Sequence, residues 1–120
     1  MSFIILGSKG FVASSLKHFL KTKNEKFKSI NKKEIDFLTN KSSTKFKKIL
    51  SRSNNVNLVI TSAIAPAKSI EDYHKNISML INITKEININ SIRKIIYISS
   101  DAVYSDTKKK INEKKENFLY

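Results

Sequence analysis

The sequence contains no cysteine. This absence excludes disulfide scaffolds, zinc-thiolate sites and cysteine nucleophiles, and it favours a reducing compartment. No apolar run approaches the roughly 20 residues that span a bilayer. The segment after Met1 also lacks the basic start and the small-residue cleavage site of a signal peptide. We therefore expect a cytoplasmic protein with no contact to a membrane.

Acidic residues are scarce, with 10 Asp and Glu against 23 Lys and Arg and a net charge of +13. Such a surplus is typical of proteins that contact nucleic acid. However, only two of the 23 basic residues are Arg, the residue that makes forked contacts to guanine and phosphate. Lys, Asn and Ile together fill 51 of 120 positions, a bias expected of AT-rich coding DNA. We expect no specific nucleic-acid recognition, and the alternative is salt-sensitive adhesion to polyanions.

A chain of 120 residues is long enough for one domain and too short for two. Its apolar pattern alternates between short continuous runs, which predict buried strands, and helix-spaced stripes. Strands that alternate with helices pair in parallel through right-handed crossovers, so we predict an α/β doubly wound parallel sheet. The predicted strands cover 3–6, 26–30, 56–60 and 95–98, a short element lies at 35–37, and the longest helical stripe lies within 71–89.

Both glycines of the chain fall in the segment Gly7-Ser8-Lys9-Gly10-Phe11-Val12-Ala13, between the first strand and the first helix. Gly7 allows a tight turn, Gly10 has no side chain to block a pyrophosphate, and Ala13 permits close packing of helix on strand. The helix N-terminus that follows offers free N–H groups to phosphate. The segment predicts a dinucleotide site, and the alternative is an ordinary glycine-containing loop.

The second predicted strand ends at Ile30-Asn31-Lys32-Lys33. Sites that prefer NAD usually have an acid here for the ribose 2′-hydroxyl, whereas NADP sites have a basic residue near the 2′-phosphate. The lysines favour NADP over NAD, although lysine pairs are frequent in this chain, so both cofactors stay open. The two histidines, His18 and His74, lie at polar helical positions without ligand spacing, so we predict surface residues and neither a metal site nor a hydrolytic triad.

Several motifs resemble the extended short-chain dehydrogenase/reductase family, the NAD(P)-dependent sugar epimerases, dehydratases and nucleotide-sugar reductases. The opening ILGSKGFVASSL is similar to the family's glycine-rich segment, and Asp36-Phe37 to its adenine-contacting pair. VNLVITSAIAPA resembles the segment whose small residues line the cofactor, and Asn76 matches an Asn on the helix that follows. Residues 98–104, Ile-Ser-Ser-Asp-Ala-Val-Tyr, resemble the signature S-S-x-x-V-Y, which is the most specific of these matches.

The resemblance implies a single Rossmann-like, NAD(P)-binding domain over residues 1–120 and a nucleotide-sugar as substrate. It implies that Ser100 binds the reacting oxygen, that Asp101 lies at the substrate, and that Tyr120 is the acid/base. The alternatives are a structural strand-end serine and a terminal tyrosine without function. The expected cofactor-binding residues are Gly7, Ser8, Gly10, Phe11, Val12, Asn31, Lys32, Asp36, Phe37, Ser62, Ala63 and Ile64.

The family's motif Y-x-x-x-K has a lysine four residues after the tyrosine, and this sequence has none beyond Tyr120. A free tyrosine needs a pKa shift of about 3 units, or ~4 kcal/mol, to act as a base near pH 7. We therefore expect no turnover from this chain alone. We expect a sheet truncated after about five strands, without the C-terminal substrate lobe, whether by a truncated gene or a fragmentary gene prediction. The alternative function is a non-catalytic dinucleotide-binding module, and the open apolar sheet edge predicts self-association.

Overall fold

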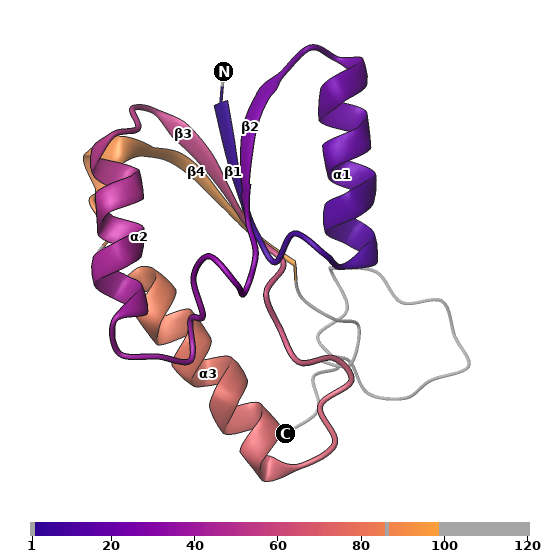
Figure 1. Ribbon diagram of the computed structural model, residues 1–120, viewed down its shortest axis with the longest axis vertical. Helices are drawn as coiled ribbons and strands as arrows, with labels where there is room; N and C mark the ends of the chain where they lie inside the picture. Colours follow the sequence, from indigo (N-terminus) through magenta and orange to yellow (C-terminus); the bar gives the residue numbers. More distant parts are fainter. Residues whose placement is uncertain (1, 86, 99–120) are drawn as a thin grey trace, which may run out of the picture.

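The computed structural model describes residues 2–85 and 87–98. Strands and helices alternate along the chain, as the apolar pattern predicts, and a sheet forms the centre of the molecule (Figure 1). The elements are β1 (Ser2–Leu6), α1 (Phe11–Thr22), β2 (Lys26–Ile30), α2 (Ser42–Ser51), β3 (Val56–Ile60), α3 (Ile70–Thr84), the 3-10 turn η1 (Ile89–Ser91) and β4 (Ile92–Tyr97).

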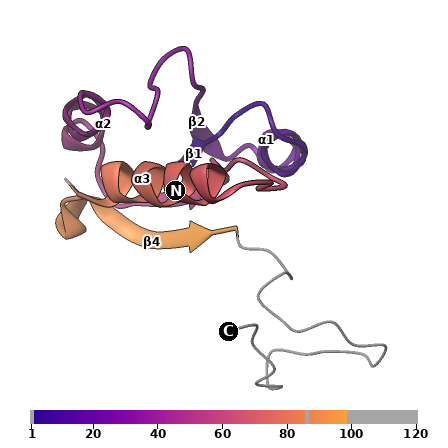
Figure 2. The ribbon, with the colours of Figure 1, turned by 90° about the horizontal axis from the view of Figure 1, so that it is seen from below.

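The four strands form one parallel sheet in the order β2-β1-β3-β4. The strand order runs outward from β1 in both directions, which confirms the doubly wound topology. Helix α1 lies on one face of the sheet and α2 on the other, as the view along the sheet shows (Figure 2). Because all strands are parallel, their carboxyl ends meet at one edge, where open α/β sheets bind ligands.

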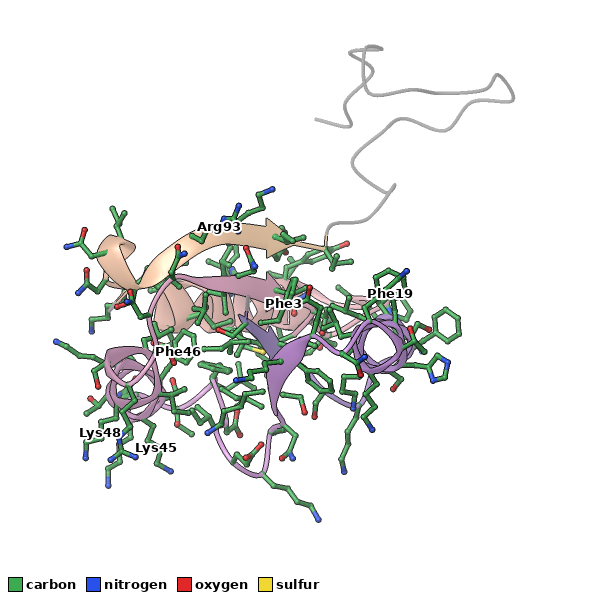
Figure 3. All side chains as sticks on the ribbon, turned by 90° about the horizontal axis from the view of Figure 1, so that it is seen from above. Phe3, Phe19, Lys45, Phe46, Lys48 and Arg93 are labelled. Atoms are coloured by element: carbon green, nitrogen blue, oxygen red, sulfur yellow. The ribbon has the colours of Figure 1, made fainter. Side chains whose placement is uncertain are left out.

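Two hydrophobic clusters hold the layers together. Along β1, Ile4 and Leu6 face the cluster under α2, whereas Ile5 faces the smaller cluster under α1. This alternation follows from the two-residue period of a strand. On α2, Phe46 is buried against the sheet while Lys45 and Lys48 point away from it (Figure 3). The two faces of β1 are therefore both covered, as its continuous apolar sequence predicts.

The segment at 35–37 is a loop with turns on either side, so no strand forms there. Ile35 and Phe37 are nevertheless buried in the larger cluster, and the Phe37 ring packs edge-on against Phe46 with centroids 5.5 Å apart. Their apolar character thus reflects packing under α2 and not strand pairing. The described part of the sheet accordingly contains four strands.

Helix α3 ends at Thr84, earlier than the apolar stripe predicts. Leu80 packs against the larger cluster, whereas Tyr73, Ile77 and Ile81 are exposed. Part of the stripe therefore lies outside the core formed by the described residues. None of the helices in this part of the chain has both the length and the apolar character that a membrane crossing requires.

Candidate functional site

Gly7 begins the turn between β1 and α1 and has a positive φ of 92°. A Cβ atom placed on it would lie 2.7 Å from the Thr61 hydroxyl and 2.8 Å from the Ser62 backbone nitrogen. Thr61 donates through both its backbone N–H and its hydroxyl to the Leu6 carbonyl, at 3.0 and 2.6 Å. The ends of β1 and β3 are thus locked together at a place that only glycine can occupy.

Gly10 is the N-cap of α1 and faces open space. Its φ is −71°, and an added Cβ would meet only the Gly7 carbonyl oxygen, at 3.9 Å. The first turn of α1 has no acidic side chain, and no side chain caps its N–H groups. Helix N-termini carry unpaired N–H groups and partial positive charge. The turn therefore presents bare backbone donors to an anion.

A cavity of about 220 Å³ lies on the β2 side of the Gly7 turn. Its wall includes Ile30 at the end of β2, the Phe37 ring and Met79 of α3, so it is mostly apolar. The Asp36 carboxylate is fixed at this wall because it accepts a hydrogen bond from the Leu38 N–H at 3.0 Å. A flat apolar ring with polar edges would fit such a cavity.

A wider cavity of about 720 Å³ lies on the other side of the turn, towards β4. Gly10, Tyr73 and Tyr97 contribute to its wall. The Asn76 side chain holds the loop that follows β3, because it accepts from the Ile64 N–H at 2.7 Å and donates to the Ile64 carbonyl at 3.1 Å. Asn76 is thus a positioning residue for the loop between the two cavities.

A third hollow, of about 190 Å³, lies over the turn itself, and its wall includes Lys9 and Lys32. Lys32 is exposed and lies 3.9 Å from the Asp36 carboxylate. Asn31 closes the turn after β2 by accepting hydrogen bonds from the Lys33 and Glu34 N–H groups. Two lysines from separate loops therefore approach the same hollow.

All twelve residues expected to bind a cofactor line one or more of these three cavities. Ser100, Asp101 and Tyr120, the residues expected to act on the substrate, lie outside the described residues. The β4 end that precedes them is placed beside β3, since the Ile98 N–H donates to the Ile60 carbonyl at 3.0 Å. The described part of the chain therefore ends, at Ile98, at the same edge of the sheet as the cavities.

Sequence reasoning missed Lys9 and Met79 as lining residues. Lys9 stands between the two glycines, and its position in the motif was the available signal. Met79 faces the cavity only because of the way α3 packs, which no local pattern gives. His18 and His74 are exposed, as predicted. Within residues 2–85 and 87–98, no cluster of three or more His, Cys, Asp or Glu side chains could hold a metal ion.

A parallel sheet with a glycine turn leading into a helix N-terminus defines the class of Rossmann-like dinucleotide-binding domains. Within this class, the model of the NAD dependent epimerase/dehydratase family matches residues 3–119. The chain therefore belongs to this family, and its cofactor is a nicotinamide dinucleotide. No curated protein matches the sequence significantly.

Three solved structures illustrate the shared fold. A GDP-6-OMe-4-keto-L-xylo-heptose reductase from C. jejuni has a TM-score of 0.76 and 19% identity, with 99% of this chain and 34% of that chain covered. MlghC, the GDP-mannoheptose C4 reductase from Campylobacter jejuni with NADP bound, has a TM-score of 0.76 and 19% identity, and the match covers 99% of this chain and 36% of that chain. A GDP-L-fucose synthetase from Naegleria fowleri bound to NADP has a TM-score of 0.74 and 16% identity, and the match covers 95% of this chain and 35% of that chain. The chain spans about a third of the length of these proteins.

Proposed function

We propose that this chain is the cofactor-binding part of an NAD(P)-dependent epimerase, dehydratase or reductase that acts on a nucleotide-activated sugar. The observation that carries the proposal is the N-terminus of α1 at Gly10, where no side chain caps the first N–H groups and an added Cβ would meet only the Gly7 carbonyl oxygen. A pyrophosphate at this point would be neutralised by the helix dipole and by N–H groups that have no partner within the helix. The family match and the NADP-bound neighbours support the same assignment.

The two large cavities fit the two ends of such a cofactor. The cavity of about 220 Å³ would hold the adenine, with Phe37 and Ile30 as apolar walls and Asp36 at the edge. The cavity of about 720 Å³ would hold the nicotinamide ribose, with the Asn76-held loop beside it. Ser62, Ala63 and Ile64 lie between them, and their small or apolar side chains would let the cofactor pass close to the end of β3.

The proposed binding is tested by titrating the purified chain with NADPH and NADH and following nicotinamide fluorescence. Gly10→Asp is the decisive variant, because a carboxylate at the pyrophosphate position repels it. We expect binding at least about tenfold weaker. Asp is also a favourable N-cap, so the variant should be as stable as the wild type. Saturable binding that this substitution leaves unchanged would contradict the proposed site.

The hollow over the turn favours NADP over NAD, because Lys9 and Lys32 would both approach a 2′-phosphate there. We expect Lys32→Ala and Lys9→Ala each to weaken NADPH binding about 3- to 10-fold, in line with one lost charge-assisted contact. NADH affinity should change little. Lys33→Ala is the matched control, since Lys33 is exposed on the same turn and is not part of the wall. Equal losses of NADPH affinity for Lys32→Ala and Lys33→Ala would show that only the overall charge matters and not a contact in the hollow.

Ser100, Asp101 and Tyr120 are the proposed substrate-side residues. The bound nicotinamide would supply or accept a hydride. Ser100 would orient the reacting oxygen, Asp101 would lie against the substrate, and Tyr120 would move the proton. In the family, the charge of a lysine four residues after this tyrosine lowers the tyrosine pKa. For these 120 residues assayed by themselves, the expected result is cofactor binding without turnover of nucleotide-sugars, and a rate above background would refute it.

A non-catalytic dinucleotide-binding module is the second candidate. It is favoured by the fact that all twelve residues expected to bind a cofactor are among the described residues that line the three cavities, a set that includes none of the residues proposed to act on the substrate. The two candidates separate in a longer chain with a lysine four residues after Tyr120, because only an enzyme would show turnover in it. Polyanion adhesion, by contrast, would disappear with added salt and survive Gly10→Asp. A cytoplasmic location stays a prediction from the sequence.

A further inference from the structure

The turn that begins at Gly7 contains carbonyl oxygens as well as N–H groups. An anion is attracted by N–H groups and repelled by carbonyl oxygens, so a turn that binds a pyrophosphate must direct its carbonyls elsewhere. The Leu6 carbonyl accepts a hydrogen bond from the Thr61 hydroxyl at 2.6 Å. The Gly7 carbonyl accepts one from the Gly10 N–H at 3.3 Å. The first two carbonyls of the turn therefore have partners within the chain.

The next carbonyl, that of Ser8, is held by a side chain of α1. The Lys17 ammonium donates to it at 2.7 Å, in a partly buried contact between residues nine positions apart. Ser8 is only 7% exposed, and Lys17 is half-buried. A charged donor makes a shorter and stronger hydrogen bond than a neutral one. Lys17 therefore ties the turn to the first helix.

The Ser8 carbonyl and the Lys9 N–H belong to the same peptide unit, which is trans. In a trans peptide, the C=O and N–H bonds point in opposite directions. Lys17 therefore fixes the direction of the Lys9 N–H, which points away from the Lys17 ammonium. Ser8, Lys9 and Gly10 all line the hollow over the turn, so this peptide unit lies at the wall of the hollow.

We infer that Lys17 is a positioning residue for the pyrophosphate of the cofactor, and that it acts through the Ser8 carbonyl without touching the cofactor. Its ammonium holds this carbonyl back, so the Lys9 N–H is presented to the hollow over the turn. Without the ammonium, the peptide unit is free to rotate, and its carbonyl oxygen competes with its N–H for the side that faces the anion. The inference rests on the proposed function for the identity of the anion, whereas the hydrogen bond to Ser8 belongs to the chain alone.

The charge of Lys17 acts in the same direction as its hydrogen bond. Lys17 lines a hollow of about 390 Å³ between α1 and β2, which shares no residue with the three cavities around the turn. A cation bonded to a carbonyl polarises the whole peptide unit, which makes the Lys9 N–H a stronger donor. The dipole of α1 adds partial positive charge at the same helix N-terminus. Both effects favour an anion at the turn.

Lys21 is the matched control, because it lies one helical turn further along α1, lines the same hollow and is exposed. Lys17→Met and Lys21→Met each remove one positive charge and keep an unbranched apolar side chain in the helix. At about 0.15 M salt, distant charges are screened. Lys17→Met should then weaken NADPH binding about 5- to 10-fold, and Lys21→Met less than about twofold. Equal losses would trace the effect to net charge and overturn the inference.

The backbone amide of Lys9 gives a second readout, by nuclear magnetic resonance, that does not depend on affinity. In the free protein, Lys17→Met should shift the Lys9 amide resonances, because the hydrogen bond at the other end of the peptide unit is lost. Lys21→Met should leave them unchanged. In the wild type, saturating NADPH should shift the same amide, since its N–H would donate to the pyrophosphate. A Lys9 amide that NADPH binding does not shift overturns the inference, and this result needs no variant to fold.

Adenosine 2′-phosphate separates a role at the pyrophosphate from a role in the fold. This ligand keeps the adenine and the 2′-phosphate and lacks the pyrophosphate, so the wild type and Lys17→Met should bind it equally. A loss as large as that for NADPH would mean that Lys17 supports the whole site through the fold, and would overturn the inference. A wild type that binds neither NADPH nor NADH would refute the proposed function and the inference together. Saturable NADPH binding with equal losses for Lys17→Met and Lys21→Met would refute the inference alone.

Discussion

Neighbouring strands β3 and β4 differ sharply in how far they are covered. Leu58 of β3 is 0% exposed, whereas Ile95, its partner on β4, is 48% exposed. Val59 is 2% exposed, against 37% for its partner Ile96. The compared residues are apolar in both strands, so the difference comes from the layers above them and not from the type of residue. The described chain completes its core around β2, β1 and β3 and leaves β4 uncovered.

The same contrast divides the candidate site. The cavity of about 220 Å³, which would hold the adenine, is lined by residues of the packed region, among them Ile30 and Phe37. The wider cavity is lined on its far side by Tyr73 and Tyr97, which are exposed. Pre-organised walls bind more tightly than walls that must be ordered on binding. We expect most of the affinity for a dinucleotide to come from its adenosine half.

The largest effect should come from removing a side chain of the packed region. Phe46→Ala deletes a ring that is 1% exposed and in edge-on contact with Phe37. Such truncations cost about 3–5 kcal/mol. The loss should appear in the free energy of unfolding measured in urea. The adenine-side cavity should be disturbed too, because Phe37 forms part of its wall.

Ile96→Ala is the control on β4. Its side chain is only partly covered, so the loss should stay below about 1 kcal/mol. If both variants lost the same stability, β4 would be covered in solution by something that the described residues do not include. The contrast between the packed region and β4 would then fail.

Much of the fold could be predicted because apolar periodicity reports local geometry directly. The runs at 3–6 and 56–60 gave β1 and β3, and the two glycines placed the turn. The element at 35–37 could not be predicted correctly, since Ile35 and Phe37 are apolar for packing under α2 and the pattern does not distinguish this from strand pairing. Ile77 on α3 belongs to an apolar stripe that predicts burial, yet its side chain is exposed. An apolar stripe does not reveal whether a neighbouring layer is present to cover it.

The next effect concerns the two glycines, which lie three residues apart. Their substitution should change different properties, stability at Gly7 and cofactor binding at Gly10. Gly7→Ala forces a side chain into a left-handed backbone and against the backbone of Thr61 and Ser62. The combined strain and overpacking should cost about 2–5 kcal/mol. Gly10→Asp should cost no stability, because Gly10 is an N-cap with extended backbone angles. Thermal unfolding and cofactor titration on both variants check this separation, which equal stability losses would contradict.

Two asparagines of α3 offer a smaller and more local comparison. Asn76 holds the loop after β3 through Ile64, and Asn82 donates to the Phe37 carbonyl at 2.7 Å, on the adenine side. Each substitution by Ala should cost about 1–2 kcal/mol through lost hydrogen bonds. Asn82→Ala should weaken the binding of adenosine 2′,5′-bisphosphate, whereas Asn76→Ala should weaken the binding only of ligands that contain the nicotinamide half. Identical affinity profiles would show that the two ends of the site are not independent.

The candidate site was predictable where it depends on backbone and short motifs. Gly7, Gly10 and Asp36 were predicted in this way, and all three line adjoining cavities. The role of Asn76 as a clamp on Ile64 was not predictable, because it depends on how α3 approaches a loop twelve residues earlier. Long-range packing of this kind has no signature in local sequence.

The smallest effect should come from the ion pair on the exposed side of α3. Glu71 and Lys75 are one helical turn apart, with the Lys75 nitrogen 2.7 Å from the carboxylate. The hydrogen bond to Glu71, followed by its charge, raises the pKa of Lys75. A raised pKa stabilises the fold below the ordinary pKa of lysine, and this contribution is lost as the pH rises through the raised value.

Glu71→Gln should therefore lower the melting temperature only slightly at neutral pH, because exposed ion pairs are screened by solvent. Part of this loss comes from the helix dipole, since Glu71 lies in the first turn of α3. Lys75→Gln removes the ion pair and keeps the dipole contact, so it should cost less. The difference between Lys75→Gln and the wild type should vanish at strongly alkaline pH. A difference that persists there would mean that Lys75 stabilises α3 through packing of its alkyl chain and not through its charge.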